Sequence, residues 1–595
     1  MATLAPSAFP STTRTRPELE SKKTISPQDY ARLVESHSKR SAAETVYPGT
    51  NFANLAAYLL GPYERHNAAS SHENVSANEP MVDTSYVTLY CFGDRGNNST
   101  HHFSLSTQLT NLNLEAQTDI KGRLLFIRGN VAPEWLAVIG AKFLLDPEFF
   151  QRHLDFKHVI RRPDYFLLPT MPSGASQMTR FRLNTIGYVM QHHRTGRGLD
   201  QADLDMVRHR AEDSWADYVE RLARGREGES RSGDSIVREF SIHDHDHFSL
   251  EQDVSVHITS ADDKWLVVVW LDVGQALNLG PAEPWSPKLF GVDPLEISLH
   301  PTIQQRDGVA LDGKSYINET VKSEEDDTNH CRIVQTASLL HLEYDRHLEA
   351  DTVSDLPIFV LIDILRLCAN SEVQLLNMIE AKISTELSPA RSQAQNEPTV
   401  SNLLYHKRVL RRHMQRLLEN KSFIETQASM TQHDSLKPCL PSGSKSKLDT
   451  ILHDFDYLLE KAKDLANECD RGMGIMMNKA SIKEAQKAIV QAERITKLTK
   501  LAFVFVPLSF TCSFFGMNFS QFSEDSDLSL WIWATLSAPI LILSMIFMNW
   551  DVAWEIRRWL TWADRASQPF RTWLTERSSR LYAHSIDRRK LTPEV

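Results

Sequence analysis

The apolar positions of the chain are concentrated near its C-terminal end, between Leu501 and Trp550. The stretch from Leu498 to Phe515 contains one charge, Lys500, and the stretch from Leu528 to Trp550 contains none. A helix needs about 20 largely apolar residues to cross the hydrocarbon core of a bilayer. The pattern therefore predicts a first transmembrane helix over 498–518, a short acidic external loop over 519–527 and a second transmembrane helix over 528–550.

Charges beside these two stretches predict their orientation. Residues 479–500 carry six Lys or Arg side chains against two Glu, and Arg557 and Arg558 follow the second stretch. The loop between the stretches has no Lys or Arg. Its acidic residues are Glu524, Asp525 and Asp527. Because basic residues flank membrane spans on the cytoplasmic side, we expect both chain ends in the cytosol and the acidic loop outside.

The alternative to a membrane hairpin is a pair of buried core helices in a soluble protein. Tryptophan favours the interface between membrane and water. Trp531, Trp533 and Trp550 stand at the ends of the second stretch, which favours the hairpin.

A long helix precedes the first span. The apolar residues from Leu448 to Cys469 recur at alternating spacings of four and three, as in a coiled coil. Beyond Gly472 and Gly474 a second series follows, most of whose members are small; we call it the small-residue stripe. Its members are Ala485, Ala488, Ala492, Ile495, Thr499, Ala502, Val506, Ser509 and Ser513. From the residues alone, the stripe either faces a water-filled pore shared by several copies or makes a close helix–helix contact.

The region 81–345 predicts a globular α/β domain. A helix is expected to begin near Pro133, since proline is tolerated in the first helical turn. Trp265–Leu271 is continuously apolar, which is typical of a strand covered on both faces. The other expected strands are Tyr86–Phe92, Leu124–Arg128, Ile236–Ile242 and Asp253–Ile258.

The remaining regions have other compositions. Residues 1–80 are rich in Ser, Thr, Pro and Asn, which predicts a mostly disordered N-terminal segment. The region 354–500 predicts a helical stalk region, with one helix to about Leu387 and another over Asn402–Thr426. The second carries a basic face that is either solvated or turned toward the acidic domain, made of Lys407, Arg408, Arg411, Arg412 and Arg416. The basic, Trp-rich tail 551–595 is predicted to be cytosolic, lying on the inner leaflet or packed against the stalk.

One cluster has the residue types of a metal site, the alternating run from His243 to His247. Histidine and aspartate bind metals, but alternate residues of a strand share a face, so only three His or two Asp lie together. A polar strand end entering a turn is favoured, and a regulatory metal site is the alternative.

Length and composition exclude several classes of function. The 595-residue chain has a formal net charge of −11, which argues against a nucleic-acid partner. Its six cysteines are scattered without a close pair, which excludes a disulfide framework or a zinc finger. No phosphate-binding motif and no nucleophile–base pattern is evident, so we expect neither an enzyme nor a catalytic cofactor.

The segment where the first span ends is distinctive. Pro507 precedes Asn518 by eleven residues, and Asn518 closes the tripeptide Gly516-Met517-Asn518, after a long charged helix and before an acidic loop. In this arrangement the sequence resembles the CorA family of divalent-cation channels, including its ZntB-like branch. The resemblance is close over about 480–550 and is one of layout elsewhere.

The resemblance implies an α+β cytosolic domain, a long stalk helix and two C-terminal transmembrane helices, assembled as a pentameric funnel. The first spans would line a central pore, with Gly516, Met517 and Asn518 as the selectivity site where ions enter. The implied pore-lining residues are Ser513, Ser509 and Val506, continued on the stripe by Ala502 and Thr499. Leu498 and Ile495 would form a hydrophobic gate. The family's regulatory acidic position falls near Ser481, so no regulatory metal residue is assigned.

Two functions follow as hypotheses. The first is a channel or transporter that passes divalent cations, Mg²⁺ above all or Zn²⁺, Co²⁺ or Ni²⁺, into the cytosol down the electrochemical gradient. The second is a non-conducting, membrane-anchored scaffold or sensor of the same build. We expect the plasma membrane. The mitochondrial inner membrane is the alternative, because Arg14 and Arg16 stand among the first seventeen residues without an acid.

Overall fold

The computed structural model describes residues 25–69, 86–93, 98–113, 120–158, 177–189, 201–224, 232–261, 264–277, 285, 297–304, 335–344, 356–388, 396–433, 442–516, 531 and 533–546. They divide into two compact units, Met1–Met476 and Met477–Val595, which are described separately. The first unit holds the sheet and most of the helices. The second holds the C-terminal part of helix α12 (Ser442–Gly516) and the helix Trp533–Ile546.

The first unit is built on a mixed, mainly antiparallel sheet with the strand order β2-β1-β3-β7-β6-β4-β8, in which β5 pairs with β6 outside this path. Only β3 and β7 pair in parallel among the described strands. The strands are β1 (Val87–Gly93), β2 (Ser99–Phe103), β3 (Ile120–Arg128), β4 (Met178–Val189), β5 (Glu239–Ile242), β6 (His247–Ala261), β7 (Lys264–Leu271) and β8 (Ile297–Leu299).

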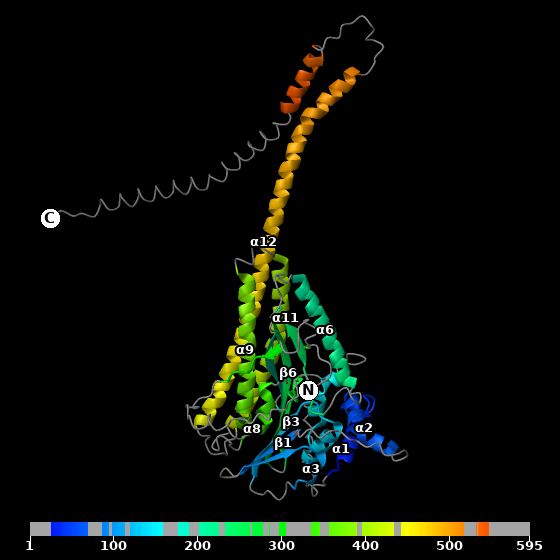
Figure 1. Cartoon of the computed structure of the whole chain (residues 1–595), viewed down its shortest axis with the longest axis vertical. Helices are drawn as coiled ribbons and strands as arrows, with labels where there is room; N and C mark the ends of the chain where they lie inside the picture. Colours follow the sequence, from blue (N-terminus) through cyan, green and yellow to red (C-terminus); the bar gives the residue numbers. More distant parts are fainter. Residues whose placement is uncertain are drawn as a thin grey trace, which may run out of the picture. The chain divides into compact units, whose positions relative to one another are not determined.

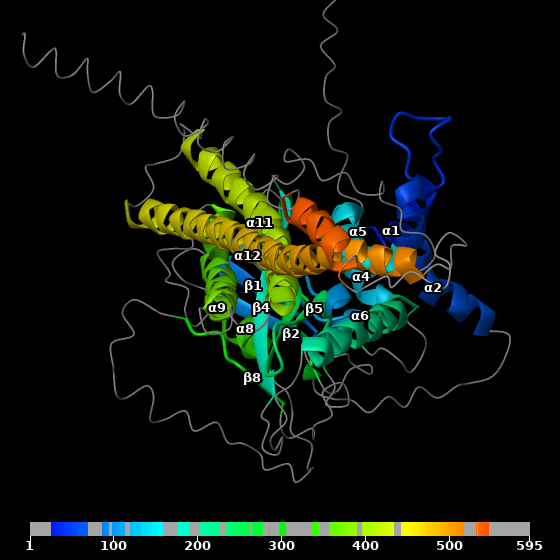
Figure 2. The ribbon, with the colours of Figure 1, turned by 90° about the horizontal axis from the view of Figure 1, so that it is seen from above.

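Helices cover both faces of this sheet (Figures 1 and 2). On one face lie the N-terminal and middle helices: α1 (Pro27–Ser38), η1 (Thr50–Phe52), α2 (Ala53–Ala69), α3 (Ser106–Asn111), α4 (Pro133–Phe143), α5 (Pro147–His153), η3 (Asp155–His158) and α6 (Gln201–Arg224). On the other face lie η7 (Thr336–Leu339), α8 (Leu340–Glu343), η9 (Pro357–Leu361), α9 (Ile362–Leu387), α11 (Asn396–His433) and the first part of α12.

Strand β7 separates the two hydrophobic cores. Leu266, Val268 and Trp270 belong to the core under α1, α4 and α6, whereas Val267, Val269 and Leu271 belong to the core under α9, α11 and α12. Strand β7 is therefore buried on both faces, as its continuous apolar run predicts.

Several sequence predictions are confirmed. Strands β1 and β7 match the expected ranges to within one residue, β3 begins four residues before the expected Leu124, and α4 begins at Pro133. The buried positions of α12 recur every three or four residues from Leu448 to Met476, as on one helical face, whereas the coiled coil stays a prediction. Gly472 allows close packing there, because a Cβ atom on it would lie 2.5 Å from Leu387 Cδ2.

Two other expectations need correction. Residues 25–69 of the segment 1–80 are not disordered, since they form α1, η1 and α2. Their apolar side chains, such as Tyr30 and Leu59, join the first core, and Tyr30 donates a hydrogen bond to the carbonyl of Leu145. The polar average composition of 1–80 gave no sign of these buried apolar side chains. The rest of 1–80 lies outside the described residues.

The second correction concerns the boundary expected between 345 and 354. Leu124 and Val254 of the sheet share one core with Leu375 of α9, Leu410 of α11 and Phe455 of α12. The sheet and these helices therefore form one unit that ends at Met476. The other predicted domain boundaries remain predictions.

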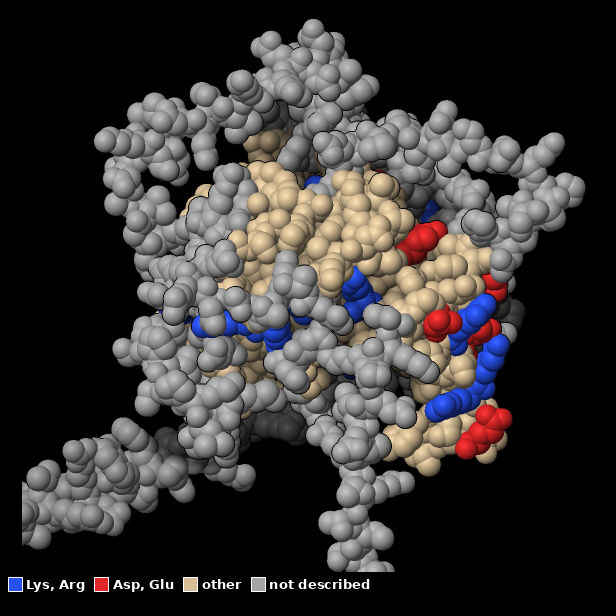
Figure 3. All heavy atoms as spheres, turned by 90° about the horizontal axis from the view of Figure 1, so that it is seen from below, with Lys and Arg blue, Asp and Glu red and all other residues tan. Residues whose placement is uncertain are grey.

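The described surface carries no large area of a single charge on the face drawn in Figure 3. Basic and acidic side chains lie next to one another along one edge, and most of the described surface is uncharged. At the C-terminal end of α1, Lys39 and Glu35 form an ion pair of 2.6 Å.

Candidate functional site

The helix Trp533–Ile546 covers one face of α12 in the second unit. Between 501 and 514, the positions of α12 shielded from solvent are Val504, Pro507, Leu508 and Thr511, and the others are exposed. Thr511 and Ser537 are each 3% exposed, and the Ser544 hydroxyl donates a hydrogen bond of 2.6 Å to the carbonyl of Phe503. The spacing of the shielded positions is that of a single helical face.

The small-residue stripe lies on the opposite face. At about 100° per residue, Ala502, Val506, Ser509 and Ser513 average about 180° from the face that contacts Trp533–Ile546. All four are exposed, Val506 at 63%. The second helix of the same chain therefore does not cover the stripe. An intrachain helix–helix contact is excluded as its explanation within the described residues, whereas a contact between copies is not.

Hydroxyl groups on the stripe have a defined orientation. Ser509 donates to the carbonyl of Val506 over 2.9 Å, and Thr499 donates to the carbonyl of Ile495 over 2.8 Å. Because each hydrogen is directed to the backbone of its own helix, the oxygen lone pairs remain as acceptors at the surface. A stripe of acceptors can contact cations or the waters around them.

The predicted gate residues are also exposed. Ile495 is 63% and Leu498 is 66% exposed; Ile495 lies on the stripe, and Leu498 lies about 60° from its line. Gly516 is the last residue of α12, and a Cβ atom there would meet nothing within 4 Å. The other predicted residues of the ion entrance lie outside the described residues: Met517, Asn518, Glu524, Asp525 and Asp527.

Only one described helix, Ser446–Phe514, is long and apolar enough to cross a membrane, judged by length and composition. The helix Trp533–Ile546 is apolar but shorter. The second transmembrane helix over 528–550 therefore remains a prediction, as does the tail 551–595, which lies outside the described residues.

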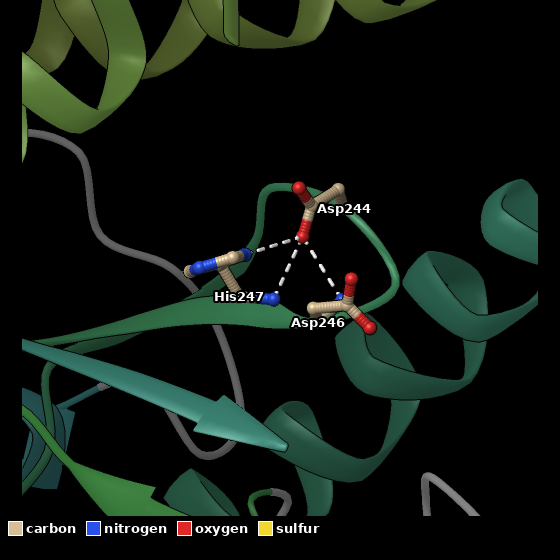
Figure 4. Close-up of side chains that lie close together, drawn as sticks. All are labelled: Asp244, Asp246 and His247. Carbon is tan, nitrogen blue, oxygen red and sulfur yellow. Dashed lines mark hydrogen bonds and ion pairs between the residues drawn. The ribbon is translucent and has the colours of Figure 1, made fainter. Parts of the chain in front are cut away.

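The run His243–His247 forms the turn between β5 and β6. Asp244, Asp246 and His247 offer ligand atoms within 4.8 Å of one another (Figure 4). Asp244 Oδ1 accepts hydrogen bonds from the backbone N–H groups of Asp246 and His247, at 2.9 and 2.7 Å, and contacts His247 Nδ1 at 3.0 Å.

Lys382 of α9 already pairs with Asp244 of this cluster. Its ammonium group pairs with Asp244 Oδ2 and lies 3.1 Å from His247 Nδ1. Burial raises the pKa of Asp244, but the hydrogen bonds from His247 and Lys382 outweigh it and lower that pKa. Because the ammonium group of Lys382 lies where a metal cation would, the structure favours the predicted polar strand end entering a turn over a metal site.

Two buried clusters were not found from the sequence. In the first, Arg238 Nε lies 2.6 Å from Asp272 Oδ2 and its Nη1 lies 2.8 Å from Asp155 Oδ1. Burial lowers the pKa of Arg238, but Asp272 and Asp155 outweigh it and raise that pKa. The cluster joins η3, the segment before β5 and the end of β7.

The same cluster contains a serine, a histidine and an aspartate in the order of a catalytic triad. His153 Nδ1 lies 2.8 Å from Ser255 Oγ, and its Nε2 lies 3.1 Å from Asp272 Oδ1. These side chains come from positions far apart in the chain, so no motif indicates them. Ser255 is 2% exposed, the other two are fully buried, and the His153 ring stacks on Trp270 at 3.8 Å. No substrate carbonyl can reach this serine, so we assign the three a structural role.

The second cluster joins the sheet to α9 and α11. His413 Nδ1 lies 2.8 Å from Glu372 Oε1, and its Nε2 lies 3.4 Å from Glu251 Oε1. Arg412 also pairs with Glu251. The basic face of α11 was expected to be either solvated or turned toward the acidic domain. Arg412 is turned toward that domain, whereas Arg408 and Arg411 are exposed.

A family model described as CorA-like Mg²⁺ transporter protein matches residues 347–556. No curated protein matches the chain. Among solved structures, the complete structure of the CorA magnesium transporter from Methanocaldococcus jannaschii matches with 11% identity and a TM-score of 0.34, covering 78% of this chain and 98% of that chain.

Proposed function

Because residues 347–556 belong to the CorA-like Mg²⁺ transporter family, we propose that this protein carries divalent metal cations, Mg²⁺ foremost, across a membrane into the cytosol. The observation that carries the proposal is the position of the small-residue stripe. It is exposed and lies opposite the face of α12 that the second helix covers.

We propose that several copies, five by the family's pattern, bring their stripes together around a central pore. One helix cannot enclose a channel, whereas a ring of helices with small residues inward can. The second helix of each copy would then lie on the outside as a second transmembrane helix. The hydroxyl oxygens of Thr499, Ser509 and Ser513 would face the pore, and Ile495 and Leu498 would narrow it at the cytosolic end.

The proposed selectivity site is Gly516-Met517-Asn518. A helix C-terminus carries partial negative charge, which favours an approaching cation. The Asn518 amide would add a neutral acceptor. Mg²⁺ loses its waters reluctantly, so a ring of amides can hold the hydrated ion by hydrogen bonds and still release it, as conduction requires.

The proposed driving force is the membrane potential. It supplies about 2.3 kcal/mol per elementary charge for each 100 mV, and therefore about twice that for a divalent ion. Glu524, Asp525 and Asp527 would concentrate cations at the external mouth. Because the membrane potential drives cations into the cytosol, this inward transport would need no nucleotide.

The test is uptake of divalent ions by proteoliposomes that contain the full chain, across a panel of Mg²⁺, Zn²⁺, Co²⁺ and Ni²⁺. We expect potential-driven uptake of Mg²⁺ that Asn518→Ala abolishes, with assembly unchanged on size-exclusion chromatography. Ser523→Ala, in the predicted loop that follows Asn518, is the control and should transport normally. Absence of uptake of every ion by the wild-type protein would favour the non-conducting scaffold or sensor instead.

A further inference from the structure

Pro507 interrupts the hydrogen bonding of α12 at one identifiable carbonyl. Proline has no backbone N–H, so the carbonyl four residues earlier loses its helical donor. In α12 that carbonyl belongs to Phe503. The apolar composition around it makes this costly, because an unsatisfied carbonyl in hydrocarbon has no water to accept from.

The second helix supplies the missing donor. The Ser544 hydroxyl lies 2.6 Å from the Phe503 carbonyl oxygen. Ser544 also stands on the side of its helix that contacts α12, in line with Ser537, which is 3% exposed. The bond therefore joins the two helices at the residue where the proline leaves an acceptor free.

We propose that Ser544 is a positioning residue, whose hydroxyl replaces the backbone hydrogen bond lost at Pro507 and thereby fixes the second helix and the local path of α12. The stripe residue Val506 lies directly before the proline, so the path of α12 here sets where the stripe lies. The effect on transport rests on the proposed function, whereas the hydrogen bond between the helices does not.

A double-mutant cycle in the full chain tests the bond. Ser544→Ala should shift the equilibrium between packed and separated helices about threefold toward separation, the average worth of a hydrogen bond between helices in membranes, and lower the melting temperature in detergent. In the Pro507→Ala background the Phe503 carbonyl regains a backbone donor, so Ser544→Ala should cost nothing further. Ser544→Thr keeps the hydroxyl and should melt as the wild type does.

Ser537→Ala is the matched control. Ser537 is buried in the same contact, and its hydroxyl has no hydrogen-bond partner among the described residues. Its removal should not lower the melting temperature. An equal loss from Ser544→Ala in both backgrounds would assign Ser544 to packing alone and overturn the proposal, as would no loss in either.

Uptake measured on the same variants separates this proposal from the proposed function. If the wild type transports ions, Ser544→Ala should slow uptake and Ser544→Thr should restore it; unchanged uptake in Ser544→Ala would overturn the claim that the bond positions the stripe. If the wild type transports nothing, the proposed function fails while the melting cycle still decides whether the hydrogen bond exists.

Discussion

His413 offers a quantitative test of the first unit, because it is a buried cation held between two acids. Its side chain is 1% exposed, on α11, and it contacts Glu372 of α9 and Glu251 of β6. Burial lowers the pKa of His413, but Glu372 and Glu251 outweigh it and raise that pKa to about 9. The imidazolium therefore connects the sheet to both helices at neutral pH.

The pKa gives the size and the sign of the effect. A rise from 6.5 to about 9 corresponds to about 3 kcal/mol of folding free energy, at 1.36 kcal/mol per unit. Because the folded-state pKa is raised, the contribution is complete below pH 6.5, declines as the pH rises toward 9 and is absent above it. The wild-type protein should therefore lose stability between these values.

His413→Gln should abolish the decline in stability between pH 6.5 and 9, and it should destabilise the protein at pH 6.5. Glu251 keeps its pairing with Arg412, whereas Glu372 keeps only the amide of Asn184, at 2.5 Å, among the described residues. Leaving one partner of a buried pair without the other costs about 3–5 kcal/mol. Adding Glu372→Gln should recover part of that cost, because a neutral amide replaces the unpaired charge.

The assay is thermal unfolding of the full chain in detergent, followed by tryptophan fluorescence from pH 6 to about pH 9.5, which spans the titration of His413. His209→Gln is the control, since His209 is 82% exposed on α6 and 3.7 Å from Glu212; its profile should match the wild type. If the melting temperature of His413→Gln fell as steeply as that of the wild type between pH 6.5 and 9, the assignment of a charged, buried His413 would be wrong.

Two further predictions concern the same unit. Gly474→Ala should stabilise α12 by about 1 kcal/mol, since nothing lies within 4 Å of the added carbon. Gly472→Ala should not stabilise it, because the added carbon would lie 2.5 Å from Leu387 Cδ2 and 3.1 Å from Leu403 Cδ1. Equal melting temperatures of the two variants would show loose packing at Gly472. Burial lowers the pKa of His341 to about 3, so its neutral form is favoured in the folded state and the free energy of unfolding falls as the pH drops below 6.5. His341→Phe should make the acid side of the pH–stability profile shallower, and an unchanged profile would contradict this.

Local signals were enough to predict part of the structure. The apolar run of β7 and the spacing of the apolar residues in α12 reflect burial within a single element, and the proline that begins α4 marks a helix start, so all three can be seen in the sequence. The small-residue stripe was found for the same reason, because helical spacing places its residues on one face without reference to any neighbour.

Contacts between distant segments could not be predicted in this way. The 12-residue strand β4 alternates polar residues at 180, 182 and 184 with apolar ones, and only the fold shows that Arg182 meets Glu251 and Asp253 and that Asn184 meets Glu372. The basic face of α11 left two readings open, since the partner of Arg412 lies 161 residues away. The ion entrance at Asn518 rests on the sequence alone, because it lies outside the described residues.

The central claim is that the stripe of α12 faces the ion path, and thiol accessibility at two neighbouring positions tests it most directly. Ser509 lies on the stripe, and Phe510 lies about 100° away around the helix. With Cys512 replaced first, Ser509→Cys should be blocked by small thiol reagents during uptake, and Phe510→Cys should be insensitive. The reverse result, with Phe510→Cys blocked and Ser509→Cys unaffected, would mean that the stripe is a contact between helices and that the ion path, if any, lies on another face.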